Sequence, residues 1–190
     1  RNAMDKTYQV LLFITVPAAV GIMMLSTQIY HVLYEQSEMG ATVLAHYAPV
    51  AILFALFAVT ASLLQGIDYQ KWIIFSLLTG ILTKLVLNIP LIKWLQVDGA
   101  ILATAIGYGV TITINIFVIH KALNYQSTMV RRRILLIFIL TGVMAVAVGV
   151  TIAVLNTFLS ADTKLMAVVY CVVGVGVGAS VYGLISLRIG

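Results

Sequence analysis

The chain contains six apolar stretches that are each long enough to cross a lipid bilayer as a helix. They lie at about 8–27, 43–66, 71–94, 98–122, 133–157 and 163–187. Each stretch of roughly 20–25 residues matches a hydrocarbon core of about 30 Å at about 1.5 Å per residue. Only 9% of the 190 residues are charged, whereas soluble domains carry roughly 25%. The sequence therefore predicts an all-α, polytopic transmembrane helix bundle with six spans.

Basic residues are distributed unequally between the two sides of these spans. With the N-terminus placed in the cytoplasm, eight of them lie inside: Arg1, Lys6, Lys71, Lys121, Arg131, Arg132, Arg133 and Arg188. Only Lys93 and Lys164 lie outside. The positive-inside rule then predicts that both termini of this segment are cytoplasmic. The run 131–133 is interpreted as a cytoplasmic anchor, which leaves a contact with anionic lipid headgroups open and predicts no nucleic-acid partner.

Lys84 lies near the middle of the third stretch, which reads KWIIFSLLTGILTKLVLNIPLIKW. Trp72 and Trp94 mark its two ends, and the helix between them would measure about 33 Å. A lysine at that depth costs about 2.5–3.5 kcal/mol on insertion scales and marks a candidate functional site. Two interpretations stay open: Lys84 faces a polar cavity, or it bonds to groups of a neighbouring helix.

Further polar side chains lie on the third and fourth stretches. Asn88 follows Lys84 by four residues, so the two share one helix face. The fourth stretch contains a row at spacings of three or four residues: Thr104, Tyr108, Thr111 and Asn115. Such a row either forms hydrogen bonds between helices or lines a water-filled passage, and the sequence favours neither. All six residues are candidates for a substrate cavity.

Prolines and small residues indicate where the helices bend and pack. Pro17, Pro49 and Pro90 lie inside expected spans, where a missing backbone donor predicts a kink. Small residues recur at four-residue spacing in the last three stretches: Gly99, Ala103 and Gly107; Ala145, Gly149 and Ala153; Gly174 and Gly178. In lipid this spacing favours close helix–helix contact.

The segment 28–42 separates the first two apolar stretches. Ile29, Val32 and Leu33 share one helical face there, beside Tyr30 and Tyr34. This pattern is typical of a short helix that lies at the membrane interface. An ordinary polar loop is the alternative interpretation.

No residue pattern typical of an enzyme or of a metal site is visible. The sequence shows no cluster of metal ligands, no Walker loop and no serine–histidine–acid arrangement. His31, His46 and His120 all fall near expected helix ends, where an interfacial role is favoured over a ligand role. We therefore expect no catalytic residue, no metal ion and no cofactor.

Four strings resemble a known transporter family: TVPAAVGIMML, HYAPVAILFALFAVTASLLQGI, KLVLNIPLI and DGAILATAIGYG. They are similar to the MurJ-type and stage V sporulation protein B-like flippases of the multidrug/oligosaccharidyl-lipid/polysaccharide exporter superfamily. The resemblance covers nearly all of residues 7–122. It is weaker over 123–190, where hydrophobicity dominates.

The resemblance implies a larger fold of about fourteen helices, with two six-helix lobes around a cationic cavity. Residues 1–122 would be the last four helices of the second lobe. Residues 123–132, which include the polar stretch LNYQSTMVR, would be a cytoplasmic linker. Residues 133–190 would be two additional helices that contact the lipid tail of the substrate. The opening Arg1–Met4 is unusual for a natural start: either part of it was added to the natural sequence, or the chain is a piece of a longer protein. The resemblance implies a C-terminal portion, with the missing N-terminal helices of the same protein as partners.

The resemblance also implies a function. The chain is expected to help move a lipid-linked oligosaccharide or peptidoglycan precursor across the cytoplasmic membrane by alternating access, with membrane lipids around it. The alternatives are a multidrug cation antiporter of the same superfamily and a membrane subunit that transports nothing. Drug cations require acidic cavity residues, and no acidic residue is expected at membrane depth.

Overall fold

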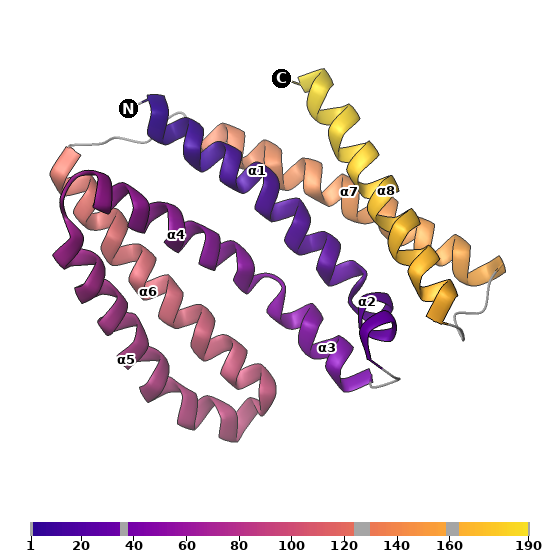
Figure 1. The fold of residues 1–190 in the computed structure, drawn as a ribbon, viewed down its shortest axis with the longest axis horizontal. Coiled ribbons are helices and arrows are strands. Elements are labelled where there is room, and N and C mark those ends of the chain that lie inside the picture. The colour runs from indigo at the N-terminus through magenta and orange to yellow at the C-terminus, as the bar shows by residue number, and fades with distance from the viewer. Residues whose placement is uncertain (1, 35–37, 124–129, 159–163, 190) are drawn as a thin grey trace. The chain divides into compact units, whose positions relative to one another are not determined.

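A computed structural model describes residues 2–34, 38–123, 130–158 and 164–189, and these ranges form helices without strands (Figure 1). The helices are α1 (Asn2–Met24), α2 (Ser26–Leu33), α3 (Glu38–Tyr47), α4 (Val50–Gly66), α5 (Gln70–Leu95), α6 (Val97–Leu123), α7 (Val130–Phe158) and α8 (Lys164–Ile189). Six segments are long and apolar enough to cross a membrane: Lys6–Met24, Gly40–Gly66, Gln70–Leu95, Val97–Ala122, Leu136–Thr157 and Met166–Ser186. The predicted all-α class with six spans is confirmed.

The chain divides into two compact units. The first unit comprises Arg1–Leu12 and Val50–Arg131, and the second comprises Phe13–Pro49 and Arg132–Gly190. One boundary coincides with Pro49, where the second span leaves helical geometry between the end of α3 and the start of α4. By contrast, α1 and α5 continue through Pro17 and Pro90. A proline can therefore interrupt one span here and be accommodated inside two others.

In the first unit α4, α5 and α6 lie side by side, joined by two tight turns (Figure 1). Each turn uses one non-glycine residue with positive φ: Asp68 at 59° and Gln96 at 52°. The Tyr69 N–H donates to the Leu64 carbonyl at 2.9 Å, and the Gln96 N–H donates to the Ile92 carbonyl at 2.9 Å. Because these bonds pair carbonyls at the helix ends, α4 can reverse directly into α5, and α5 into α6.

Small residues line the contact between α5 and α6. A Cβ atom added to Gly80 would collide with the Thr111 side chain and the Gly107 carbonyl, and one added to Gly99 would collide with the Leu91 backbone. Ala103, one turn before Gly107, has no exposed surface. The predicted close packing along this row of α6 is confirmed, and it sets the register of the two helices.

The second unit packs the rest of α1, with α2, against α7 and α8. Its buried cluster consists of Leu25, Leu140, Met144, Val148 and Tyr182. A Cβ atom on Gly174 would meet Leu25, and one on Gly178 would meet Val148. The small residues of α8 thus admit side chains of neighbouring helices, as predicted. In the α7 row Gly149 lies near Met24, whereas Ala153 is exposed and does not continue the contact.

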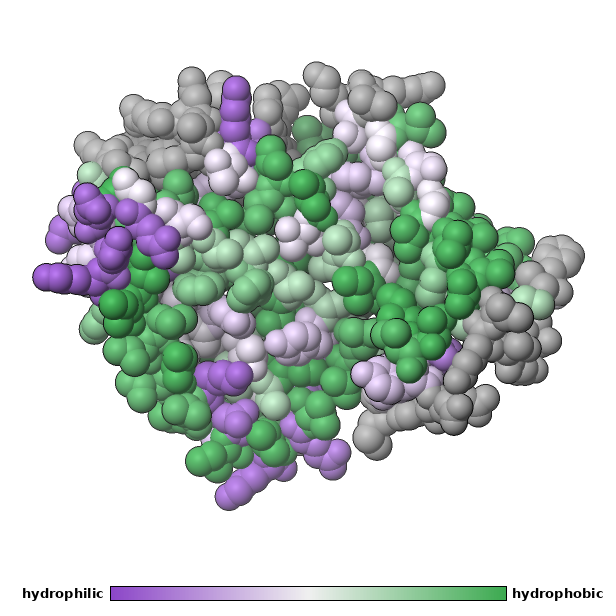
Figure 2. Space-filling view, in the orientation of Figure 1, coloured by the Kyte–Doolittle hydropathy of each residue, from purple (hydrophilic) through white to green (hydrophobic). Residues whose placement is uncertain are grey.

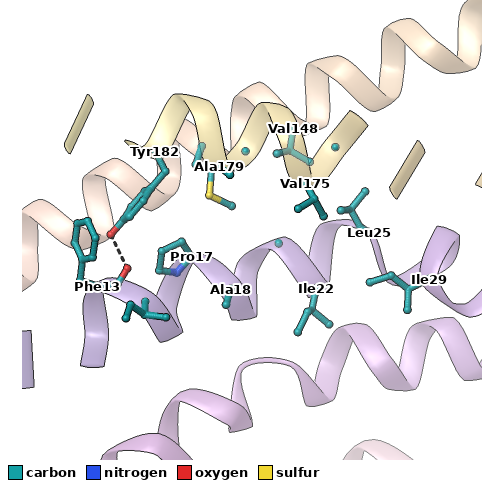
Figure 3. Close-up of a pocket in the computed structure, with 15 residues that line it drawn as sticks. Phe13, Pro17, Ala18, Ile22, Leu25, Ile29, Val148, Val175, Ala179 and Tyr182 are labelled. Carbon is teal, nitrogen blue, oxygen red and sulfur yellow. Dashed lines mark hydrogen bonds between the residues drawn. The ribbon is translucent and has the colours of Figure 1, made fainter. Parts of the chain in front are cut away.

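Tyr182 of α8 forms a hydrogen bond with the backbone carbonyl of α1 that Pro17 leaves unpaired (Figure 3). Pro17 has no N–H group, so the carbonyl of Phe13, four residues earlier, loses its helical donor. The Tyr182 hydroxyl donates to that carbonyl at 2.9 Å, and the rings of Phe13 and Tyr182 lie 4.9 Å apart. A side chain thus replaces the missing backbone donor in a region without water.

Apolar side chains cover the outer surfaces of the helices. On α5 the exposed residues include Ile74, Leu78, Leu82, Leu85, Val86 and Ile89. Figure 2 shows hydrophilic side chains gathered mainly at the two ends of the α5–α6 hairpin, with hydrophobic side chains between them. This distribution is what a hydrocarbon environment requires of a helix bundle.

The α5–α6 contact can be tested with two glycines of the same helix. In Gly107→Leu, the new side chain must displace the α5 backbone at Gly80 and the Lys84 side chain. We expect a loss of about 1–3 kcal/mol in unfolding free energy, measured in detergent. Gly109→Leu is the matched control, because nothing lies within 4 Å of its added Cβ. Equal stability of the two variants would contradict the packing described.

The hydrogen bond between the Tyr182 hydroxyl and the Phe13 carbonyl can be tested with a double-mutant cycle. Tyr182→Phe removes only the hydroxyl and is expected to cost about 0.5–1.5 kcal/mol of unfolding free energy. Pro17→Ala restores a backbone N–H that can reach the Phe13 carbonyl. In that background the cost of Tyr182→Phe should therefore nearly vanish. An unchanged cost would show that the Tyr182 hydroxyl stabilises α8 in another way.

Candidate functional site

Lys84 lies on the face of α5 that contacts α6. Ser76 and Gly80, at spacings of four residues, are the buried residues of that helix face. The Lys84 Cβ lies next to Gly107, and the residue as a whole is half-buried. Within the described part of the chain, the Lys84 side chain has neither a hydrogen-bond partner nor an ion-pair partner. Its amine is thus available to a group that these residues do not supply.

Asn88 lies one turn further along the same face of α5. It is half-buried, and its Oδ1 atom is buried without a hydrogen-bond partner among the described residues. A buried amide oxygen left unpaired costs about 1–3 kcal/mol. Lys84 and Asn88 therefore form a polar pair in an apolar span, with hydrogen-bonding capacity that the described residues leave unused.

Asn115 joins three helices of the first unit. Its Oδ1 accepts a hydrogen bond from Ser76 Oγ on α5 at 2.6 Å. Its Nδ2 donates to Thr60 Oγ1 on α4 at 3.2 Å. All three side chains have no exposed surface. This geometry favours the interpretation of Asn115 as an interhelical hydrogen-bonding residue.

Thr111 belongs to the same buried layer. Its hydroxyl lies 3.0 Å from the Gly107 carbonyl on its own helix and 3.3 Å from the Ser76 carbonyl on α5. Both acceptors are backbone groups, so the hydroxyl stays paired without water. For Thr111 and Asn115 a contribution to a substrate cavity remains a prediction.

Thr104 and Tyr108 occupy the remaining positions of the polar row on α6, and both are half-buried. The Thr104 hydroxyl donates to the Ala100 carbonyl at 2.8 Å. The Tyr108 ring lies 6.0 Å from the ring of Phe54 and 6.0 Å from that of Phe57, both on α4. The row therefore faces two neighbours: α5 on the side of Thr111, and α4 on the side of Tyr108.

Ser76 and Thr60 were not singled out from the sequence, although they complete the buried network. The available signal was weak, because hydroxyl residues are frequent in membrane helices and bond mostly to their own backbone. Thr79, Thr83 and Thr113 do so here. For Ser76 there was one usable signal: it lies two turns before Lys84 on the same helix face. For Thr60 the sequence offers no such signal.

An apolar cavity of about 450 Å³ lies in the second unit between α1, α7 and α8 (Figure 3). In the close-up, Pro17 of α1 and Leu25 just after it face Val175, Ala179 and Tyr182 of α8. The wall is almost entirely hydrocarbon, since the polar groups at its end, the Tyr182 hydroxyl and the Phe13 carbonyl, are bonded to each other. The cavity fits an apolar chain and offers nothing to a charged group.

The expected arginine anchor and the expected linker fall largely outside the described residues. Arg131, Arg132 and Arg133 fall within α7, but their side chains lie outside the described residues. Most of the expected linker 123–132 lies outside them as well, at positions 124–129. Among the described residues, no group of three or more histidine, cysteine, aspartate or glutamate side chains could hold a metal ion.

Comparison with known proteins finds a relative with a named function. The chain is 41% identical over 191 aligned residues to lipid II flippase MurJ of Bacillus subtilis (strain 168). The alignment covers 98% of this chain and 35% of the relative, so the chain spans about a third of that protein's length. No family model and no solved structure matches. The resemblance predicted from the sequence is confirmed, and it extends over residues 123–190, where the strings alone were weak.

The network around Asn115 can be tested by truncation. Asn115→Ala leaves the Ser76 and Thr60 hydroxyls without their shared partner, and we expect a loss of about 1–2 kcal/mol in unfolding free energy in detergent. Thr113→Ala is the control on the same helix. The Thr113 side chain is exposed and bonds only to the Gly109 carbonyl, so its removal should change stability by less than about 0.5 kcal/mol. A smaller loss for Asn115→Ala than for Thr113→Ala would contradict the assignment.

Proposed function

We propose that this chain is part of a flippase that moves a lipid-linked oligosaccharide or peptidoglycan precursor across the cytoplasmic membrane by alternating access. The observation that supports this most directly is the 41% identity to a lipid II flippase over 98% of the chain. The six apolar spans agree with a multi-pass membrane protein. Since the chain covers about a third of that relative, the activity would belong to a larger assembly of helices.

The charges within the spans fit an anionic substrate better than a cationic one. Across the six spans the one acidic residue is Asp98, in the first turn of α6, whereas Lys84 lies near the middle of α5. A multidrug cation antiporter requires carboxylates at membrane depth. A membrane subunit without transport would give no reason for an unpaired lysine there. Both alternatives are therefore less favoured than the flippase.

We propose that Lys84 and Asn88 face the substrate cavity and contact the pyrophosphate of the lipid headgroup. The lysine supplies a positive charge and the amide supplies a hydrogen-bond donor. The lysine has no hydrogen-bond or ion-pair partner among the described residues. On Asn88 the buried unpaired atom is the acceptor Oδ1, so a contact with phosphate would use the Nδ2–H group. Thr104 and Tyr108 are the α6 candidates for the same cavity, with further walls from helices outside this chain. A phosphate group would stabilise the cation that is otherwise costly in hydrocarbon.

The apolar cavity of the second unit is proposed to hold part of the polyprenyl chain of the substrate. This assignment rests on the family resemblance, which gives the last two helices a tail-binding role. The cavity wall between Pro17 and Tyr182 supports it, because an isoprenoid chain would contact hydrocarbon side chains throughout. Pro17 and Pro90 would supply the bending that alternating access requires, together with the helix interruption at Pro49.

The orientation in the membrane is part of the same proposal. An even number of spans places both termini of the segment on one side, and the excess of basic residues makes that side the cytoplasm. Residues 1–122 would complete the second lobe, 123–132 would be the cytoplasmic linker with its arginine anchor, and 133–190 would add two further helices. The remaining partners would be the N-terminal helices of the same protein.

A translocation assay separates the function from the role of Lys84. The intact protein that includes this chain should support translocation of a lipid-linked peptidoglycan precursor in cells depleted of their own flippase. Lys84→Glu should reduce translocation by at least about tenfold, because a carboxylate repels the pyrophosphate. Lys84→Arg should retain most of it. Lys93→Glu, at an exposed position near the end of α5, is the control.

The assay distinguishes failure of the flippase proposal from failure of the role proposed for Lys84. Absence of translocation by the unmodified protein, despite normal membrane insertion, would contradict the flippase proposal. Normal translocation by both the unmodified protein and Lys84→Glu would leave the function standing and remove Lys84 from the cavity. A lower unfolding temperature in both Lys84→Glu and Lys84→Gln would indicate that the lysine charge stabilises the fold, whereas a decrease in Lys84→Glu alone would reflect the cost of a carboxylate within the span.

A further inference from the structure

A second cavity lies in the first unit, between the beginning of α5 and the end of α6. Its volume is about 720 Å³, larger than that of the apolar cavity in the second unit. Tyr69, Trp72 and Phe75 form one wall, and Phe117 and Lys121 belong to the other. An aromatic wall combined with a single cation is a chemistry that neither the apolar cavity nor the polar residues around Lys84 provide.

The position of this cavity along the spans gives it one polar end and one apolar end. The α5 span begins at Gln70 and the α6 span ends at Ala122, so Lys121 lies at the edge of the hydrocarbon region. Thr113, on the same wall, lies two turns deeper, or about 12 Å along the helix. The cavity thus extends from the membrane interface into the hydrocarbon layer.

The charges at the polar end are predominantly positive. Lys121 and Lys71 are both exposed there, and Asp68 is the acidic residue of the same turn. A small adjoining cavity, which shares Tyr69 and Trp72 with the main one, brings Lys71 and Asp68 next to it. Among the described residues neither lysine has an ion-pair partner. Of the charges described at this end, one positive charge is therefore in excess.

We propose that this cavity binds an anionic glycerophospholipid, with its phosphate at Lys121 and one acyl chain between Phe75 and Phe117. A basic group at the interface between two helices, above an apolar groove, is the arrangement that recognises acidic lipid headgroups. The aromatic rings of Tyr69 and Trp72 lie at headgroup depth, where such rings are favourable. A soluble anion would leave the apolar depth of the cavity empty, and a zwitterionic lipid would bring a second cation to Lys121.

The proposal goes beyond the flippase function and does not depend on it. The site lies at the beginning of α5 and the end of α6, and Trp72 is about 18 Å of helix from Lys84. The lipid tail of the substrate is proposed to contact the second unit. Lipid binding can also be measured without translocation. A protein that binds the phospholipid but does not translocate the lipid-linked precursor would support this site and contradict the flippase proposal. A protein that translocates the precursor without binding the phospholipid would do the opposite.

Tryptophan fluorescence gives a direct test, because this chain has two tryptophans and one of them lines the cavity. The intact protein is prepared with Trp72 as its only tryptophan and is reconstituted with phosphatidylglycerol or phosphatidylcholine that carries brominated acyl chains. We expect phosphatidylglycerol to quench Trp72 with about fivefold higher relative affinity. Lys121→Gln should bring the ratio close to one, and Lys121→Arg should preserve it.

Two controls decide whether the cavity or the charge alone is responsible. Lys93→Gln, at the opposite end of α5, should leave the preference at Trp72 unchanged. In the variant with Trp94 as the only tryptophan, Lys93 is adjacent in sequence but Trp94 is 87% exposed, so no comparable preference is expected. An equal preference at Trp94, equal quenching of Trp72 by both lipids, or a preference that survives Lys121→Gln would each overturn the proposal.

Discussion

The absence of water inside a bilayer is the constraint on which the rest of this structure depends. Each backbone or side-chain polar group within a span must find a partner in the protein, because the cost of leaving it unpaired is several kcal/mol. The hydroxyls of Thr79, Thr83 and Thr104 meet this requirement by bonding to carbonyls four residues back. The carbonyl freed by Pro17 meets it through Tyr182. Lys84 and Asn88 do not meet it among the described residues, and that contrast is what sets them apart.

The same constraint explains why the glycines of α5 and α6 matter for the candidate site. Apolar side chains gain little by moving from lipid into a helix contact, so close backbone approach and hydrogen bonds must hold the two helices together. Gly80 and Gly107 permit the approach, and Ser76 and Asn115 supply the bond one or two turns away. Lys84 follows Gly80 by one turn on the same face. Its position half inside the contact is therefore a consequence of the packing of its neighbours.

The number and limits of the spans could be predicted from the sequence because they depend on local hydropathy and length alone. The small-residue contacts of α6 and α8 could be predicted for a similar reason, since four-residue spacing places them on one face. The partner of the Phe13 carbonyl could not be predicted. Pro17 identifies the orphaned group, but Tyr182 lies 169 residues away, and the helix register that brings it there depends on packing. The network of Thr60, Ser76 and Asn115 could not be predicted either, because a hydroxyl in a helix can bond to a carbonyl of its own helix, as those of Thr60 and Ser76 also do. Whether Lys84 faces a substrate could not be predicted either, because no residue described in this chain pairs with its amine.

The tight turn at Gln96 has a consequence for how the protein is made. Ribosomes deliver α5 to the membrane before α6 exists, so Lys84 first enters the insertion machinery on a helix without a partner. The contact at Gly107 forms only after the chain has been extended well into α6. Because so short a turn leaves no slack between the two helices, α6 must follow α5 into the membrane as the second arm of a hairpin. Lys84 therefore reaches its half-buried position against Gly107 only once both arms of the hairpin are in the membrane.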